Sequence, residues 1–166
     1  MHRTLVVILC IFAPFVHAQL KTAPQRAMGE KTEHMQHATG PFDVKVASQK
    51  PDSDVAQAAN LSRMSLDKQF HGDLEAVSKG EMLAAQTEVK GSGAYVAMER
   101  VAGVLNGRKG SFLMYHTGIM TRGVPHLSVT VVPDSGTEEL KGLSGKMNII
   151  IAPDGKHSYE FEYTLE

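Results

Sequence analysis

Apolar and polar residues alternate one by one along several segments of this 166-residue chain, and short turn-forming sequences separate those segments. The clearest example is SYEFEYTL at residues 158–165, where every second residue is aromatic or aliphatic and the others are polar. Neighbouring side chains of a β-strand point to opposite faces, so this pattern gives one apolar and one polar face. Turns that contain Gly, Pro, Asn or Asp between such segments are typical of antiparallel hairpins. The sequence therefore predicts consecutive β-strands.

About eight segments have the character of strands, and the short Ala-rich stretch at 54–61 is the only helix candidate. The expected strands cover residues 42–47, 64–70, 74–80, 94–105, 111–121, 127–131, 147–152 and 158–165. Consecutive antiparallel strands hide their edges by closing into a barrel or by packing as a sandwich. The apolar, largely aromatic face of the last strand favours closure around an apolar interior. We therefore predict an all-β fold, an eight-stranded antiparallel β-barrel, which is wide enough for packed side chains or one small ligand.

The N-terminal residues have the parts of a secretory signal peptide. A basic start is followed by LVVILCIFAPF at residues 5–15, which is shorter than the roughly 20 residues of a membrane-spanning helix and contains a proline. Val-His-Ala at residues 16–18 then provides a small-residue cleavage sequence. We expect a signal peptide at 1–18, a flexible leader at 19–39 and the barrel domain at 40–166. The expected location is secreted or periplasmic.

Charge and cysteine content narrow the range of partners and cofactors. Lys and Arg number 17 against 18 Asp and Glu, which argues against nucleic-acid binding and against a polybasic membrane-surface protein. The single cysteine, Cys10, lies in the predicted signal peptide, so the remaining chain has no disulfide, thiolate or iron–sulfur chemistry. His34 and His37 are three residues apart, but no carboxylate or cysteine completes a metal site. We expect no cofactor, no metal, no nucleic acid and no membrane insertion after signal removal.

Several long stretches resemble an uncharacterised bacterial family, domain of unknown function 3224, whose barrel is similar to that of allene oxide cyclase. The resemblance covers nearly all of the chain from Gly40 to Glu166, and its most specific part is VVPDSGTEELKGLSGKM before an aromatic last strand. Glu138 departs from the pattern, which has Gly at this position, so that loop is expected to be more rigid or differently turned. The other stretches are FHGDLEAVSKGEML, YVAMERVAGVLNGRKGSF, HTGIM and HSYEFEY. The resemblance implies the barrel fold and transfers no catalytic residue, because the family has no established activity.

Two titratable residues lie inside apolar strand segments, Glu99 in YVAMERV and His116 in FLMYHTGIM. They are the catalytic candidates, because a carboxylate and an imidazole in a pocket can perform acid–base chemistry. The alternative is structural: Glu99 faces solvent or pairs across strands, and His116 is a satisfied barrel residue. Sequences for phosphate-binding loops, dinucleotide binding, zinc proteases and serine hydrolases are absent.

The strand register decides between these alternatives. If Leu105 pairs with Ser111, Glu99 lies opposite Thr117, and if Leu105 pairs with Gly110, Glu99 lies opposite His116. A shift of one residue exchanges the two faces of a strand, so both registers remain open.

Tyr95, Glu99, Tyr115 and His116 are the predicted ligand-binding residues. Tyr95 and Glu99 are four residues apart on one strand and therefore share a face; in the comparison with allene-oxide-cyclase-like barrels this face looks inward. Lys68 and its neighbour Asp67 are interpreted as surface charges.

The expected pKa of the Glu99 carboxyl group depends on the surroundings in which it is buried. If it faces a largely apolar cavity, desolvation raises its pKa above the unfolded value. Replacing Glu99 by Gln would then leave stability unchanged or improved above neutral pH.

Three functions follow from this interpretation. The first is an exported barrel that binds a small apolar molecule in its cavity, and the second is a cofactor-free isomerase or cyclase for a hydrophobic substrate. The third is a structural or interaction protein with a filled barrel. The strands at 94–105 and 111–121 are apolar on both faces, and exposed apolar surface commonly marks an interface. We therefore also expect a homo-oligomer.

Overall fold

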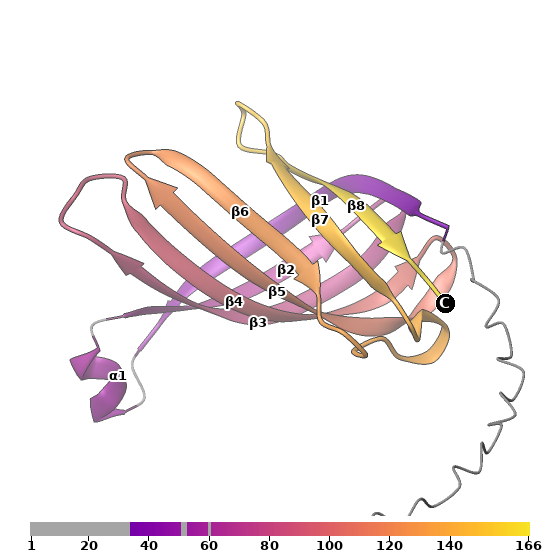
Figure 1. The fold of residues 1–166 in the computed structure, drawn as a ribbon, viewed down its shortest axis with the longest axis horizontal. Helices are drawn as coiled ribbons and strands as arrows, with labels where there is room; N and C mark the ends of the chain where they lie inside the picture. Colours follow the sequence, from indigo (N-terminus) through magenta and orange to yellow (C-terminus); the bar gives the residue numbers. More distant parts are fainter. Residues whose placement is uncertain (1–33, 51–52, 60) are drawn as a thin grey trace, which may run out of the picture. The chain divides into compact units, whose positions relative to one another are not determined.

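The computed structural model describes residues 34–50, 53–59 and 61–166, which form a closed eight-stranded antiparallel barrel (Figure 1). Each strand pairs with the next one in sequence, and β8 pairs with β1. The predicted fold class is confirmed. The elements are β1 (Gln36–Gln49), α1 (Asp54–Ala58), β2 (Ser62–Phe70), β3 (Leu74–Gln86), β4 (Gly93–Leu105), β5 (Arg108–Thr121), β6 (Val124–Val131), η1 (Glu138–Leu140), β7 (Ser144–Ile151) and β8 (His157–Thr164).

The predicted signal peptide and most of the predicted leader lie outside the described residues. Strand β1 begins at Gln36, four residues before the predicted start of the barrel. The first half of β1 pairs with β8 and the second half with β2, so residues 36–39 belong to the sheet. Ala38 is fully buried, and it is the one apolar residue in this stretch, which is why alternation did not mark it as a strand. Within the described part of the chain, no helix is long and apolar enough to cross a membrane.

A two-residue turn joins β4 to β5 and fixes the register between them. Asn106 and Gly107 have φ of 46° and 81°, the left-handed conformations of the Asn-Gly hairpin turn. Leu105 therefore pairs with Arg108. Both predicted registers, Leu105 opposite Ser111 or Gly110, are wrong, because they assume a longer loop. In the observed register His116 lies opposite Ala97, and Glu99 lies opposite Met114.

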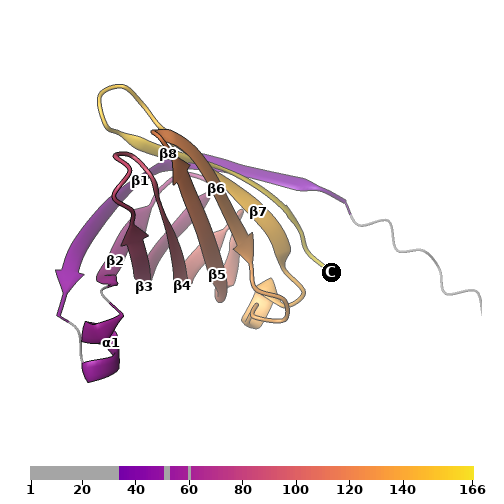
Figure 2. The ribbon, with the colours of Figure 1, turned by 60° about the vertical axis from the view of Figure 1, so that its left-hand side comes forward.

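The inward-facing residues become more exposed from one end of the barrel to the other. We call the filled end the floor and the other end, at the β3–β4 and β5–β6 connections, the mouth (Figure 2). The floor is packed with fully buried side chains, including Phe112 and Tyr163, and with Leu140 of η1. On β4 the inward residues change from buried Val101 to half-buried Tyr95, and on β5 from buried Phe112 to exposed Met120. The lower half of the interior is therefore a packed core, and the upper half is open.

The connection between β6 and β7 has two unusual features. The two strands pair only at Thr130 and Lys146, and they diverge towards the mouth (Figure 1). Between them, Glu138 has φ of 52°, in the left-handed region that favours glycine. The loop therefore keeps a glycine-like conformation at the position where the sequence departs from the family pattern.

Candidate functional site

Four polar side chains meet inside the barrel, one from each of the four consecutive strands β2 to β5. They are Lys68, Ser78, Glu99 and His116, and all four are buried. We call them the Glu99 cluster. Lys68 lies opposite Ser78 in the ladder between β2 and β3. Glu99 lies opposite Gly80, where an added Cβ would be 2.6 Å from the Glu99 Cβ, so glycine leaves space for this side chain.

The Glu99 carboxylate accepts hydrogen bonds from the other three members of the cluster. Lys68 Nζ donates to Oε1 at 2.8 Å, and Ser78 Oγ donates to Oε2 at 2.6 Å. His116 Nε2 also lies 2.8 Å from Oε1. Lys68 Nζ is additionally 5.7 and 5.8 Å from the ring centres of Phe42 and Phe70, within the range of cation–π attraction. The buried charges are thus paired and hydrogen-bonded, as charges in a protein interior must be.

These contacts set the charge of Glu99. Burial desolvates the carboxyl group and by itself raises its pKa, but the His116 hydrogen bond and the Lys68 charge outweigh this effect and lower the pKa to about 2. Glu99 is therefore a carboxylate at neutral pH. The condition for a raised pKa, a largely apolar cavity around Glu99, is not met, because Glu99 faces three donors; the alternative, in which Glu99 pairs with a cation, is the one observed.

An ionised carboxylate has no proton to donate, so His116 must donate from Nε2 to Glu99. The other ring nitrogen, Nδ1, has no hydrogen-bond partner among the described residues. The ring is thus oriented by Glu99 through one nitrogen and leaves the second nitrogen unpaired.

Tyr95 lies one step closer to the mouth on the same inner face. Its partner in the ladder is Gly118, and a Cβ at Gly118 would be only 2.1 Å from the Tyr95 ring. The ring therefore lies across Gly118, next to His116 on β5. Burial, followed by the nearby Glu99 charge, raises the pKa of Tyr95, so its hydroxyl stays protonated. Like His116 Nδ1, this hydroxyl has no hydrogen-bond partner in the part of the chain that the structure describes.

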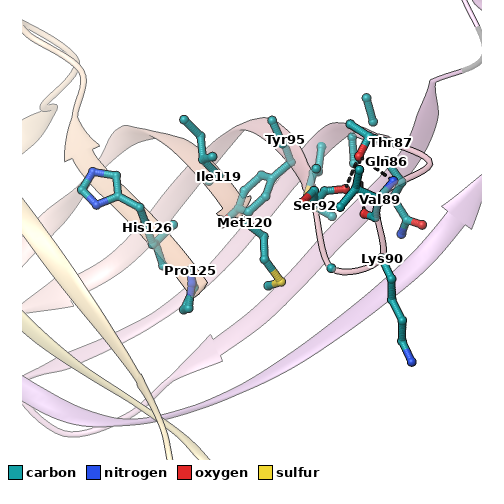
Figure 3. A pocket seen from close by; sticks show the side chains of 18 residues that line it. Gln86, Thr87, Val89, Lys90, Ser92, Tyr95, Ile119, Met120, Pro125 and His126 are labelled. Atoms are coloured by element: carbon teal, nitrogen blue, oxygen red, sulfur yellow. Dashed lines mark hydrogen bonds between the residues drawn. The ribbon is translucent and has the colours of Figure 1, made fainter. Parts of the chain in front are cut away.

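A pocket of about 450 Å³ opens at the mouth between the β3–β4 and β5–β6 connections (Figure 3). Met82, Tyr95, Met120 and Leu127 give it a largely apolar wall, and His126 and the β3–β4 loop form its rim. The Glu99 cluster does not line this pocket. Tyr95 lines it and is also the inward neighbour of the cluster along β4, so Tyr95 adjoins both the pocket and the cluster.

The structure brings three of the four predicted ligand-binding residues together on the inner face: Tyr95, Glu99 and His116. Tyr115 does not join them. It is adjacent to His116 and must therefore point to the opposite face, where it is 39% exposed. Its inclusion in the predicted site is corrected.

Sequence reasoning missed Lys68 and Ser78. Lys68 was interpreted as a surface charge, but it is buried and paired with Glu99, whereas Asp67 lies outside in an ion pair with Lys79. The signal was present in the alternation, because Lys68 lies between Leu66 and Phe70 on the apolar face of β2. Lysine side chains are usually exposed, and this general tendency favours the surface interpretation that the structure contradicts.

Within residues 34–50, 53–59 and 61–166, no group of three or more His, Cys, Asp or Glu side chains has the arrangement of a metal site. His34 and His37 are both exposed.

Comparisons with known proteins identify a family for this chain. The sequence model of a family described as a protein of unknown function, DUF3224, matches residues 38–163. A solved structure of a protein with unknown function from the same family, from Shewanella oneidensis MR-1, is 48% identical to this chain with a TM-score of 0.73. The match covers 80% of this chain and 99% of the Shewanella chain. No curated protein matches.

Proposed function

Because this chain belongs to the DUF3224 family, whose function is unknown, we propose a function from the barrel itself: it binds a small, mostly apolar molecule at the mouth. The observation that supports this proposal is the mouth pocket. Its volume of about 450 Å³ is within the range of small-molecule sites. Such sites combine apolar walls with a few polar groups that orient the ligand.

Tyr95 provides a polar group of this kind. Its hydroxyl lacks a partner in the described structure, stays protonated and lines the pocket. A ligand with an apolar body and one hydrogen-bond acceptor fits this arrangement. The packed floor is consistent with the same proposal, since the fully buried core lies there and the pocket lies at the mouth.

The proposal is tested with the neutral fluorophore N-phenyl-1-naphthylamine, whose emission rises in apolar surroundings. We expect saturable binding to the wild-type protein. Ala84 lies opposite Tyr95 on the inner face, so Ala84→Phe fills the pocket and should weaken binding at least tenfold. Ala102→Phe is the matched control, because Ala102 lies on the outer face of β4. Absence of saturable binding, or equal binding by both variants, contradicts the proposal and favours a filled structural barrel.

A second candidate function is chemistry without a cofactor, as an isomerase or cyclase for a hydrophobic substrate. The observation that favours it is the His116 ring, which Glu99 orients through one nitrogen while the other has no partner in the described residues. Confinement and a few oriented groups are sufficient for such reactions. Turnover of a bound apolar molecule, compared with binding alone, distinguishes the two candidates.

Export is a further proposal, supported by the sequence of residues 1–18 alone. The expected mature N-terminus is Gln19, after the Val-His-Ala sequence. Intact-mass measurement of the protein outside the cytoplasm should find this N-terminus. Retention of Met1 in that material contradicts the proposal.

We also propose that a second copy covers the outer face of β3 to β5. Exposed apolar side chains are contiguous there, and they include Leu83, Val96 and Met98. Glu81, which pairs with Arg63 of the same chain, and Arg100 border Met98, so two faces related by a two-fold axis can place opposite charges near each other. Sedimentation analysis should find a dimer that Met98→Lys converts to a monomer. A monomeric wild-type protein contradicts this proposal.

A further inference from the structure

His116 has a chemically available nitrogen in an almost closed interior. Its side chain is only 5% exposed, and Glu99 holds it through Nε2. Every buried polar side-chain atom among the described residues has a hydrogen-bond partner. Since Nδ1 has no such partner, it must adjoin accessible space. An imidazole held in one tautomer by a carboxylate, with its other nitrogen free, is the arrangement of a general base.

The neighbouring Glu99 carboxylate is better suited to supporting His116 as the base than to acting as the base itself. The Glu99 carboxylate already accepts three hydrogen bonds, and this makes it a weak proton acceptor. Its contribution is to orient the imidazole and to stabilise the positive charge that forms when Nδ1 takes a proton. Glu99 is thus a positioning residue.

Tyr95 supplies a donor on the same side of His116 as the pocket. The register places Ala97 opposite His116 and Gly118 opposite Tyr95, so Tyr95 and His116 are diagonal neighbours on one face. Side chains at such positions can reach the same small molecule. A hydroxyl that donates to an oxygen on which negative charge develops lowers the barrier to forming that charge.

We propose that this part of the barrel is a proton-transfer site for small apolar carbon acids, with His116 as the base and Tyr95 as the donor to the developing oxyanion. The inference rests on ligand binding at the mouth. The C–H bond next to a carbonyl group breaks, its proton goes to His116 Nδ1, and its electron pair forms an enolate whose oxygen accepts a hydrogen bond from Tyr95. Where the carbonyl compound is β,γ-unsaturated, the enolate is extended over the double bond, and return of the proton from His116 to its γ carbon gives the conjugated isomer. No oxidant, reductant or cofactor is consumed.

The test uses 5-nitrobenzisoxazole, a flat apolar carbon acid. Removal of its C3 proton breaks the N–O bond and releases 2-cyano-4-nitrophenolate, which is measured by absorbance. We expect a saturable rate at least tenfold above buffer in the wild-type protein. His116→Gln keeps an N–H donor for Glu99 and should lower kcat at least tenfold, with unchanged binding of N-phenyl-1-naphthylamine. His37→Gln is the matched control, since His37 is exposed on β1 and does not line the pocket, and it should leave the rate unchanged.

The role of Glu99 is tested in the double variant Lys68→Met, Glu99→Gln, which has no buried charge in the cluster. We expect kcat to fall at least tenfold while fluorophore binding is retained, a split that loss of folding would not give. His116→Asn replaces His116→Gln if the latter does not fold.

Fluorophore binding without catalysed release of the phenolate, or with equal release by His116→Gln, overturns the proton-transfer site and leaves the binding proposal intact. Absence of saturable fluorophore binding to the wild-type protein contradicts the binding proposal, and with it this inference.

Discussion

His116 and Glu99 are joined at 2.8 Å between Nε2 and Oε1, although they are not opposite each other in the sheet. His116 faces Ala97, and Glu99 faces Met114. The contact is therefore diagonal, and two long side chains on one face of the sheet span it. Diagonal positions on one face of a sheet are within reach of such side chains.

Glu99→Gln should destabilise the protein, because it leaves the Lys68 ammonium buried without a counter-charge. Breaking a buried ion pair on one side costs about 3–5 kcal/mol. We expect this loss in urea denaturation at neutral pH, with much of it recovered in the double variant Lys68→Met, Glu99→Gln. Asp67→Asn breaks an exposed pair with Lys79 and should cost less than about 1 kcal/mol. A Glu99→Gln variant as stable as the wild-type protein would contradict the pairing.

The stability of the protein should fall at acid pH through Glu99. Its pKa is lowered from 4.5 to about 2 in the folded state, so the unfolded chain binds this proton more tightly. The stabilisation is complete above about pH 4.5 and is lost as the pH falls towards 2, and it amounts to on the order of 3 kcal/mol. Thermal denaturation between these pH values, with the double variant Lys68→Met, Glu99→Gln as reference, measures it. Parallel pH profiles for the two proteins would show that Glu99 does not have this shifted pKa.

Gly118→Ala should disturb the position of Tyr95. An added Cβ would lie 2.1 Å from Cε1 of the Tyr95 ring, so the ring must move. Overpacking of this kind costs about 1–3 kcal/mol. In a Tyr95→Ala background the clash is absent and the cost should disappear, which a double-mutant cycle in urea measures. An equal cost in both backgrounds would mean that the ring does not lie across Gly118.

Tyr159→Phe should weaken the floor of the barrel. The Tyr159 hydroxyl accepts a hydrogen bond from the Leu74 backbone N–H at 2.8 Å, and the carbonyl oxygens of Thr39 and His71 lie within reach of its proton. Loss of the hydroxyl leaves a buried N–H without a partner, which costs about 1–3 kcal/mol. Tyr115→Phe, on the exposed outer face, is the control and should change stability by less than about 0.5 kcal/mol. Similar effects of the two substitutions would rule out this role of the Tyr159 hydroxyl.

The sequence by itself determined the strands and the class of fold. Alternation is a local property, because adjacent side chains of a strand point to opposite faces whatever the strand pairs with. For this reason it placed Tyr95 and Glu99 on one face. It also placed Lys68 with Leu66 and Phe70, although that lysine was interpreted as exposed. The same rule, applied strictly, excludes Tyr115 from the face of His116.

Only the tertiary structure decided how these residues meet. The two-residue turn at Asn106 and Gly107 set the register, and the register made Glu99 and His116 diagonal neighbours. The pKa of Glu99 then depended on partners from β2, β3 and β5, which lie 31, 21 and 17 residues away in sequence. Desolvation and ion pairing shift a carboxyl pKa in opposite directions, so burial alone cannot give the sign. That sign is fixed by distances between side chains on different strands, and these side chains meet only once β2 to β5 have paired.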